Sequence, residues 1–130
     1  MIYPELGVMS LEDKKIVKVM QNIFQGNSAT NLVQYELIKL FYKTPNNYYT
    51  EEQICNSLSI KPLILIEALQ SLITLDIIKK HKGKYIYNQN PQIKKEINCL
   101  LEYGKSKNGN LKILLHLLMM GRHSGRSKKL

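Results

Sequence analysis

Apolar residues recur at helical spacing along most of this chain, and turn-forming residues separate the segments. Ser10 and Asp13 are arranged much as in a capping box, and the apolar positions after them predict an amphipathic helix over about 11–25. The stretch "GNSATN" predicts a turn. The same spacing then predicts a second helix over about 31–43, which "TPNN" ends.

A pair of helices joined by a short turn follows. Thr50 and Gln53 form a capping box at the start of a short helix. After a turn at residues 59–61, Pro62 suits the first turn of a helix, predicted over 62–75, because its missing N–H goes unused there. Apolar residues face inward in both helices: Ile54, Cys55 and Leu58 in the first, and Leu65, Ala68, Leu69 and Leu72 in the second.

The spacing then changes to that of strands. In "IIKKHKGKYIYN", Ile78 lies on one arm, while Tyr85 and Tyr87 alternate on the other. Lys82 and Gly83 occupy the turn between the arms, so a β-hairpin is predicted. Its two tyrosines are expected to face the core.

Two further helices close the chain. Asn90 and Pro91 are typical of a helix start and predict a helix over 91–103. The stretch "KSKNGN" predicts a loop, and residues 111–120 predict a helix that is apolar on nearly every side. The remaining residues, "GRHSGRSKKL", predict a flexible basic tail without acids.

A helix that is apolar on every side needs more cover than a chain of 130 residues supplies. We therefore expect a homodimer formed through the flanking helices 11–25 and 111–120. Leu114 and Leu118 are the residues expected in this interface.

Positive charge is concentrated in the second half of the chain, although the net charge of the whole is +9. Residues 1–75 hold six lysines against seven acids, whereas residues 76–130 hold thirteen lysines and arginines against three acids. Such asymmetry favours a polyanionic partner, nucleic acid before a membrane surface. A basic surface that is merely solvated is the alternative.

The order helix, helix, turn, helix, hairpin over residues 31–88 resembles a winged helix-turn-helix domain. The resemblance is clearest in "TEEQICNSLSIKPLILIEALQSLITLDIIKKHKGKYIY". Ser59 and Asp76 depart from the common pattern, which often has Gly at both positions. The resemblance implies a mainly α (α+β) fold, in which a three-helix helix-turn-helix core carries a two- to three-stranded β-wing and has flanking N- and C-terminal helices.

The winged-helix interpretation divides the chain into four parts. They are an N-terminal extension with an amphipathic helix (1–30), the winged helix-turn-helix domain (31–90), C-terminal helices for dimerisation (91–120) and the basic tail (121–130).

Two functions are compatible with a winged helix. Most such domains are DNA-binding regulators, which place the third helix in the major groove and the wing against phosphates or the minor groove. Others resemble the dimerisation domains of small-molecule methyltransferases, whose winged helix binds protein. No methyltransferase activity is expected here, because the catalytic domain needs far more chain.

The helix over 62–75 is poorly suited to reading bases. Its expected outer face carries Pro62, Leu63, Ile66 and Glu67, where bidentate Arg, Asn or Gln would be expected in a reading helix. Leu63 and Ile66 could contact thymine methyls or, in the alternative function, a protein partner. The nearby groups that could contact DNA include Lys61 and Gln70.

The hairpin and the tail favour DNA. Both are rich in basic side chains and lack acids, which suits contact with phosphates. The expected nucleic-acid contacts outside the helix are Lys79, Lys80, His81, Lys82 and Lys84 in the hairpin, and Arg122, Arg126, Lys128 and Lys129 in the tail. A solvated hairpin is the alternative.

No other chemistry is indicated. Cys55 and Cys99 are far apart in the sequence and do not group with histidines at metal-ligand spacing, so buried thiols and no metal or cofactor are expected. No catalytic constellation or phosphate-binding loop is found, and an enzyme is not expected. Without a signal peptide or an apolar stretch of membrane-spanning length, the sequence predicts a soluble, cytoplasmic protein.

The leading hypothesis is therefore a small dimeric winged-helix regulator that contacts double-stranded DNA through wing and tail. The alternative is a winged-helix module for protein association.

Overall fold

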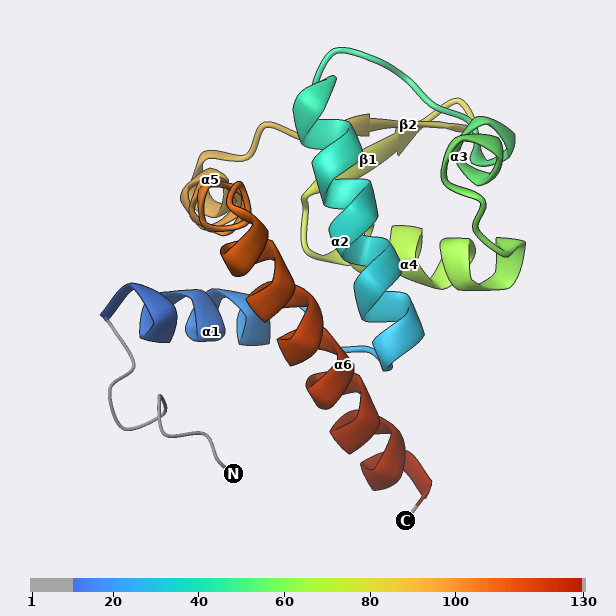
Figure 1. Ribbon diagram of the computed structural model, residues 1–130. Coiled ribbons are helices and arrows are strands. Elements are labelled where there is room, and N and C mark those ends of the chain that lie inside the picture. The colour runs from blue at the N-terminus through green and yellow to red at the C-terminus, as the bar shows by residue number, and fades with distance from the viewer. Residues whose placement is uncertain (1–10, 130) are drawn as a thin grey trace.

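The computed structural model describes the backbone of residues 11–129 and the side chains of residues 11–120. Most of this part is helical, and a small antiparallel sheet completes it (Figure 1). The elements are α1 (Leu11–Ile23), α2 (Ser28–Lys43), α3 (Glu51–Leu58), α4 (Pro62–Thr74), β1 (Ile78–His81), β2 (Lys84–Tyr87), α5 (Pro91–Tyr103) and α6 (Lys107–Lys129).

Two helices begin earlier than the sequence predicted. Helix α2 starts at Ser28, because the Asn27 side chain accepts a hydrogen bond from the Thr30 amide and caps the helix. Helix α6 starts at Lys107, where the Ser106 hydroxyl accepts from the Gly109 amide in the same way. The predicted loop "KSKNGN" is therefore mostly helix, and the bounds of α6 also include most of the predicted tail.

The predicted turn chemistry between α3 and the hairpin is confirmed. Thr50 and Gln53 make both hydrogen bonds of a capping box at the start of α3. Ser59 and Asp76, the two residues found where glycine is frequent, both adopt positive φ, at 54° and 67°. The Asp76 carboxylate also accepts hydrogen bonds from the side chains of Asn88 and Asn90, both at 2.9 Å. These bonds link the end of α4 to the end of the hairpin and the start of α5.

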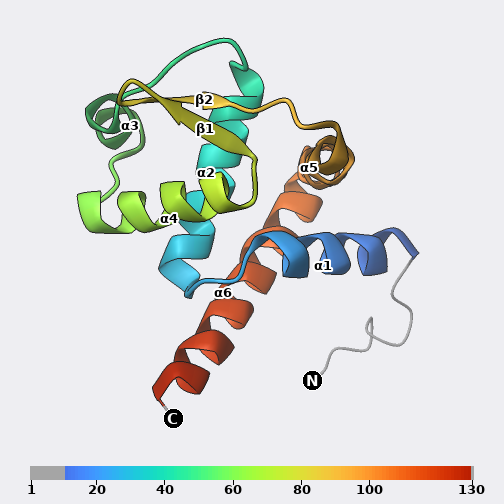
Figure 2. The same cartoon turned by 180° about the vertical axis from the view of Figure 1, so that it is seen from behind.

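Helix α2 lies at the centre of the molecule, between α4 on one side and α6 on the other (Figures 1 and 2). Its side toward α4 packs with that helix, α3 and the hairpin around one apolar core. The fully buried residues of this part include Leu37, Ile38, Phe41, Ile54, Leu65, Leu69, Leu72 and Ile77. The inward positions predicted for α4 are thus confirmed.

Helices α1 and α5 pack against each other beside α2. The apolar stripe of α1 is already buried within the chain, at Ile16, Val19, Met20 and Ile23. The expectation that α1 contributes an apolar face to a dimer is therefore not supported, since intramolecular packing uses that face.

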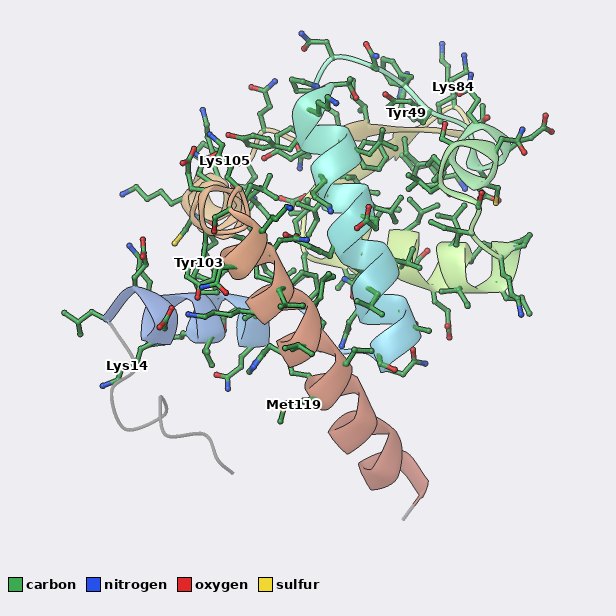
Figure 3. All side chains as sticks on the ribbon, viewed as in Figure 1. Lys14, Tyr49, Lys84, Tyr103, Lys105 and Met119 are labelled. Atoms are coloured by element: carbon green, nitrogen blue, oxygen red, sulfur yellow. The ribbon has the colours of Figure 1, made fainter. Side chains whose placement is uncertain are left out.

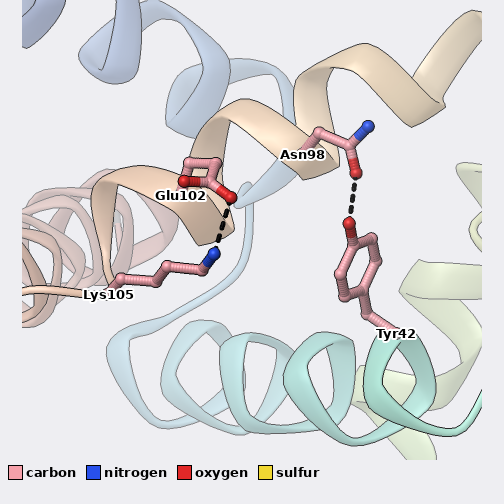
Figure 4. Close-up of polar contacts among 4 residues, drawn as sticks. All are labelled: Tyr42, Asn98, Glu102 and Lys105. Atoms are coloured by element: carbon pink, nitrogen blue, oxygen red, sulfur yellow. Dashed lines mark hydrogen bonds and ion pairs between the residues drawn. The ribbon is translucent and has the colours of Figure 1, made fainter.

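Polar contacts also join α5 to its neighbours. Asn22 at the end of α1 donates to Glu96, and the Tyr42 hydroxyl of α2 donates to Asn98 at 2.6 Å. Figure 4 shows the second contact together with the Lys105–Glu102 ion pair at the corner between α5 and α6. These bonds hold α5 against both α1 and α2.

Helix α6 is covered on one side. Ile113 and Leu117 are fully buried, and the Tyr35 hydroxyl of α2 donates to Asn110 at 2.8 Å. Burial raises the pKa of Tyr35 to about 12, so this hydroxyl stays a donor at neutral pH. Leu114, predicted for a dimer interface, is half-buried against the chain's own core.

The packing of α6 predicts a loss of stability in acid through His116. Its Nε2 atom is buried and has no hydrogen-bond partner among the described residues, and burial lowers the pKa of this imidazole below 6.5. Above that pH the side chain is neutral in both states; below it, the unfolded chain binds a proton that the folded chain resists. Stability should therefore fall as the pH drops below about 6.5.

Thermal unfolding at pH 7.5 and 5.5 checks this expectation against the His116→Leu variant. The wild type should lose more stability than the variant over this interval. Equal losses in the two proteins would assign the pH dependence to other groups.

Candidate nucleic-acid interface

The hairpin gathers the basic residues predicted for it on one exposed element. Its register pairs Lys79 with Ile86, Lys80 with Tyr85, and His81 with Lys84. Side chains alternate across the sheet, so Lys79, His81, Lys84 and Ile86 share its outer face. Lys82 occupies the turn with positive φ, and the five cationic or titratable side chains are all exposed.

The opposite face of the hairpin belongs to the core. Tyr85 and Tyr87 are buried, as the sequence predicted. The Tyr85 hydroxyl donates to the Glu51 carboxylate at 2.9 Å, and burial, together with this bond, raises its pKa to about 12. Lys80 lies over the Tyr85 ring, with its Nζ atom 5.4 Å from the ring centroid. Neither tyrosine is available to stack on a base.

A third extended segment joins the hairpin at Tyr49, between α2 and α3. Tyr49 and Tyr85 exchange two backbone hydrogen bonds, of 2.9 and 2.8 Å. The Tyr49 ring packs edge-on against Phe41, and its hydroxyl lies 2.7 Å from that of Thr44. The sheet thus has two strands and one bridging residue, within the predicted range of two to three strands.

The outer face of α4 is apolar at its N-terminal end. The side chains of Leu63 and Ile66 are exposed to 79% and 47%, next to exposed Pro62. Glu67, which would repel phosphates, has a contact inside the protein. Its carboxylate accepts a hydrogen bond of 3.4 Å from the Thr30 hydroxyl in the first turn of α2, the helix end that favours negative charge.

The C-terminal end of the same face lines a groove. Gln70, Ser71 and Thr74 of α4 face Gln25 and Asn27 of the α1–α2 turn across a volume of about 430 Å³. Gln70, a predicted nucleic-acid contact, therefore belongs to this groove. Outside this groove, the outer face of α4 is exposed at its apolar N-terminal end, at Leu63 and Ile66.

Lys61 lies apart from the hairpin lysines. It is the N-cap residue of α4, and Figure 2 shows α4 and the hairpin diverging from the segment that joins them, with α3 between their far ends. The first turn of α3 is acidic, with Glu51 and Glu52. The structure thus brings together the hairpin cations but separates them from Lys61 and Gln70. The side chains of Arg122, Arg126, Lys128 and Lys129 lie outside the described residues.

A second exposed surface lies on α6. We call it the α6 stripe: Leu111, Leu115, Leu118 and Met119, which are all exposed and are spaced for one helix face. Leu118 of the predicted interface belongs to it, whereas half-buried Leu114 does not. Within residues 11–120, this stripe is the longest run of exposed large apolar side chains on one helix.

No group of three or more His, Cys, Asp or Glu side chains in the described part of the chain could hold a metal ion. No single helix among these residues is long and apolar enough to cross a membrane. Cys55 and Cys99 are free and half-buried.

Comparisons with known proteins found no match to this chain. No protein-family model matches the chain, and neither the curated proteins nor the solved structures yielded a match.

One exposed side chain beside the hairpin was missed in the sequence. Tyr48 precedes the bridging residue Tyr49, in a segment read only as the end of a turn. The run "YYT" before the capping box has the β-propensity of a short strand, and alternation along it would have placed Tyr48 on the exposed face.

Proposed function

We propose that this chain is a winged-helix DNA-binding protein, a cytoplasmic homodimer that regulates transcription. The order α2, α3, α4 and hairpin supports the winged-helix assignment, with α3 and α4 as the helix-turn-helix pair. The Tyr49 bridge adds a third extended segment to the hairpin, in keeping with a wing of two to three strands. On this assignment the hairpin is the wing.

The observation that carries the proposal is the charge of the hairpin. Lys79, Lys80, His81, Lys82 and Lys84 are exposed, and the segment from β1 to β2 holds no acid. Lysines in this arrangement neutralise phosphates and release counterions, which provides affinity for DNA of any sequence. Contact through phosphates also agrees with the apolar outer face of α4, which offers few groups for reading bases.

The homodimer rests on the α6 stripe. Exposed apolar patches of this kind mark contacts with other molecules, and a second copy presents the same stripe. Pairing α6 with its symmetry mate would cover both stripes in one isologous contact. Dimers of DNA-binding domains also match operators with two half-sites.

A second function is favoured by one observation, the exposure of Leu63 and Ile66. With Pro62 they form an apolar patch, which is more typical of a protein contact than of a nucleic-acid contact. Under this alternative, α4 binds a protein partner and the basic hairpin is only solvated.

Replacing Leu63 and Ile66 together by serine separates the two functions. Since both side chains are exposed, the two substitutions together should lower stability by about 1 kcal/mol and leave the protein folded. If the protein binds DNA, the double variant should keep its oligomeric state and its affinity for random duplex DNA, with an altered preference for thymine-containing sites. Size-exclusion chromatography, circular dichroism and a DNA-binding assay on one sample provide the measurements.

Leu11→Ser is the matched control, because Leu11 is an exposed leucine on a different helix. Loss of the dimer or of a protein complex in the double variant alone, without any binding to DNA, would favour protein association. Unfolding of the double variant would place both residues in the core and contradict their observed exposure.

A further inference from the structure

Tyr48 lies on the same face of the sheet as the hairpin lysines. The two hydrogen bonds between Tyr49 and Tyr85 make this an antiparallel pair, and both rings point into the core. Thr50, the next residue, is extended, with φ −85° and ψ 163°. Because side chains alternate along an extended chain, Tyr48 and Thr50 lie on the outer face.

The register defines the neighbours of Tyr48. In an antiparallel pair centred on Tyr49 and Tyr85, Tyr48 falls opposite Ile86 and Thr50 falls opposite Lys84. Ile86 is paired in turn with Lys79. One row of the outer face thus runs Tyr48, Ile86, Lys79, and the next row brings Lys84 beside His81. Figure 3 shows Tyr49 and Lys84 close together on this part of the molecule.

The Tyr48 side chain is 47% exposed and makes no polar or ring contact within the described residues. Tyr42, the other exposed tyrosine within residues 11–120, differs in both respects: its hydroxyl donates to Asn98 and its ring packs edge-on against Tyr87. Tyr48 therefore presents a half-exposed aromatic ring on the face of the sheet that also carries Lys79 and Lys84.

A free aromatic ring beside lysines suits a single strand of nucleic acid better than a duplex. A base stacks on such a ring only when it is unpaired and leaves its own stack, and the lysines meanwhile neutralise the phosphates on either side. In a duplex the bases are already paired and stacked, so the ring could touch base edges, sugars or phosphates but could not stack on the face of a base. Phosphate contact by lysines alone would not require the ring.

We infer that the outer face of the sheet binds a single strand of DNA, with an unpaired base stacked on Tyr48 and phosphates held by Lys79, Lys82 and Lys84. This inference rests on the proposed DNA-binding function and assigns a further contact to the same hairpin. It gives the protein a means of engaging DNA where the duplex is opened or ends in an overhang.

Binding of labelled 20-nucleotide oligothymidine and of a random 20-base-pair duplex, measured by fluorescence anisotropy, tests the inference. The Tyr48→Ala variant should bind the single strand between about fivefold and a hundredfold more weakly, and the duplex unchanged. Tyr48→Phe keeps the ring and should bind as the wild type does. Leu11→Ala is the control for loss of a large exposed side chain away from the sheet and should also bind as the wild type does.

A tryptophan at position 48 gives a second readout, because the chain has no tryptophan of its own. Stacking with a base should quench the emission of Tyr48→Trp when oligothymidine is added. The emission of Tyr42→Trp should stay constant.

The possible failures are distinguishable. If Tyr48→Ala binds oligothymidine as the wild type does, or if Tyr48→Phe loses as much affinity as Tyr48→Ala, stacking on Tyr48 is excluded. Equal losses for duplex and single strand exclude it as well. In these cases the proposed function stands if neutralising the hairpin lysines still weakens duplex binding. If the wild type binds neither oligothymidine nor duplex DNA, both the stacking inference and the proposed DNA-binding function are overturned.

Discussion

Replacing Lys80, Lys82 and Lys84 by glutamine should weaken binding to every duplex sequence by about the same factor. The reason is that phosphate contacts position a protein on DNA without identifying bases. With three phosphates engaged by each of two hairpins, wild-type affinity should drop roughly a thousandfold between 50 and 200 mM salt. The triple variant should lose most of this dependence, which titrations of several random duplexes at the two salt concentrations would measure.

A matched control removes the same charge elsewhere. Lys14, Lys15 and Lys18 are exposed on α1, and Figure 3 shows Lys14 and Lys84 at opposite sides of the molecule. Glutamine at these three positions should leave both affinity and salt dependence near the wild-type values. Equal losses in the two triple variants would mean that net charge, rather than the hairpin, provides the binding. Wild-type binding that is insensitive to salt would contradict the electrostatic mechanism outright.

Changing Leu115 and Leu118 to glutamate should convert the proposed dimer into a monomer. Both side chains are exposed, at 52% and 41%, so the substitutions place charges in the α6 stripe and leave the core of one subunit intact. Two glutamates on each helix would put four like charges in the interface and bury them if the pair formed, which is strongly unfavourable. Light scattering should then report one chain, 15.1 kDa, instead of two.

Methionine at the same two positions is the control. It keeps the stripe apolar at nearly the same volume and should preserve the dimer. Circular dichroism would verify that the glutamate variant remains folded. A wild-type protein that is a monodisperse monomer at micromolar concentration would refute the dimer and leave the α6 stripe without an assigned role.

The sequence predicted the elements better than their starting points. Helices α2 and α6 begin earlier than expected because their caps, Asn27 and Ser106, stand in polar stretches that also resemble loops. The same residue types, such as Asn and Ser, occur as helix caps and in turns. The two roles differ only in which backbone amide the side chain binds. The box at Thr50 and Gln53 was predictable because both partners are local in sequence.

The exposed surfaces were harder to predict, since they depend on what other segments cover. The spacing of apolar residues identified the apolar stripe of α1, but it could not predict that α5 packs against this stripe. The sequence likewise offered Gln70 as a polar group for DNA contact, but it could not show that the α1–α2 turn forms a groove beside this residue. The hairpin lysines were predictable because a two-residue turn fixes the register, and the register decides which side chains are exposed.

The hydrogen bonds that join Asp76 to Asn88 and Asn90 connect three elements of the molecule mechanically. The Asp76 carboxylate is bound by Asn88, where the hairpin ends, and by Asn90, which caps α5. Three elements are therefore joined by hydrogen bonds at one junction, which couples a displacement of the hairpin base to α4 and α5. Because α5 is also bonded to α1 and α2, a force on the hairpin would be transmitted beyond its own base.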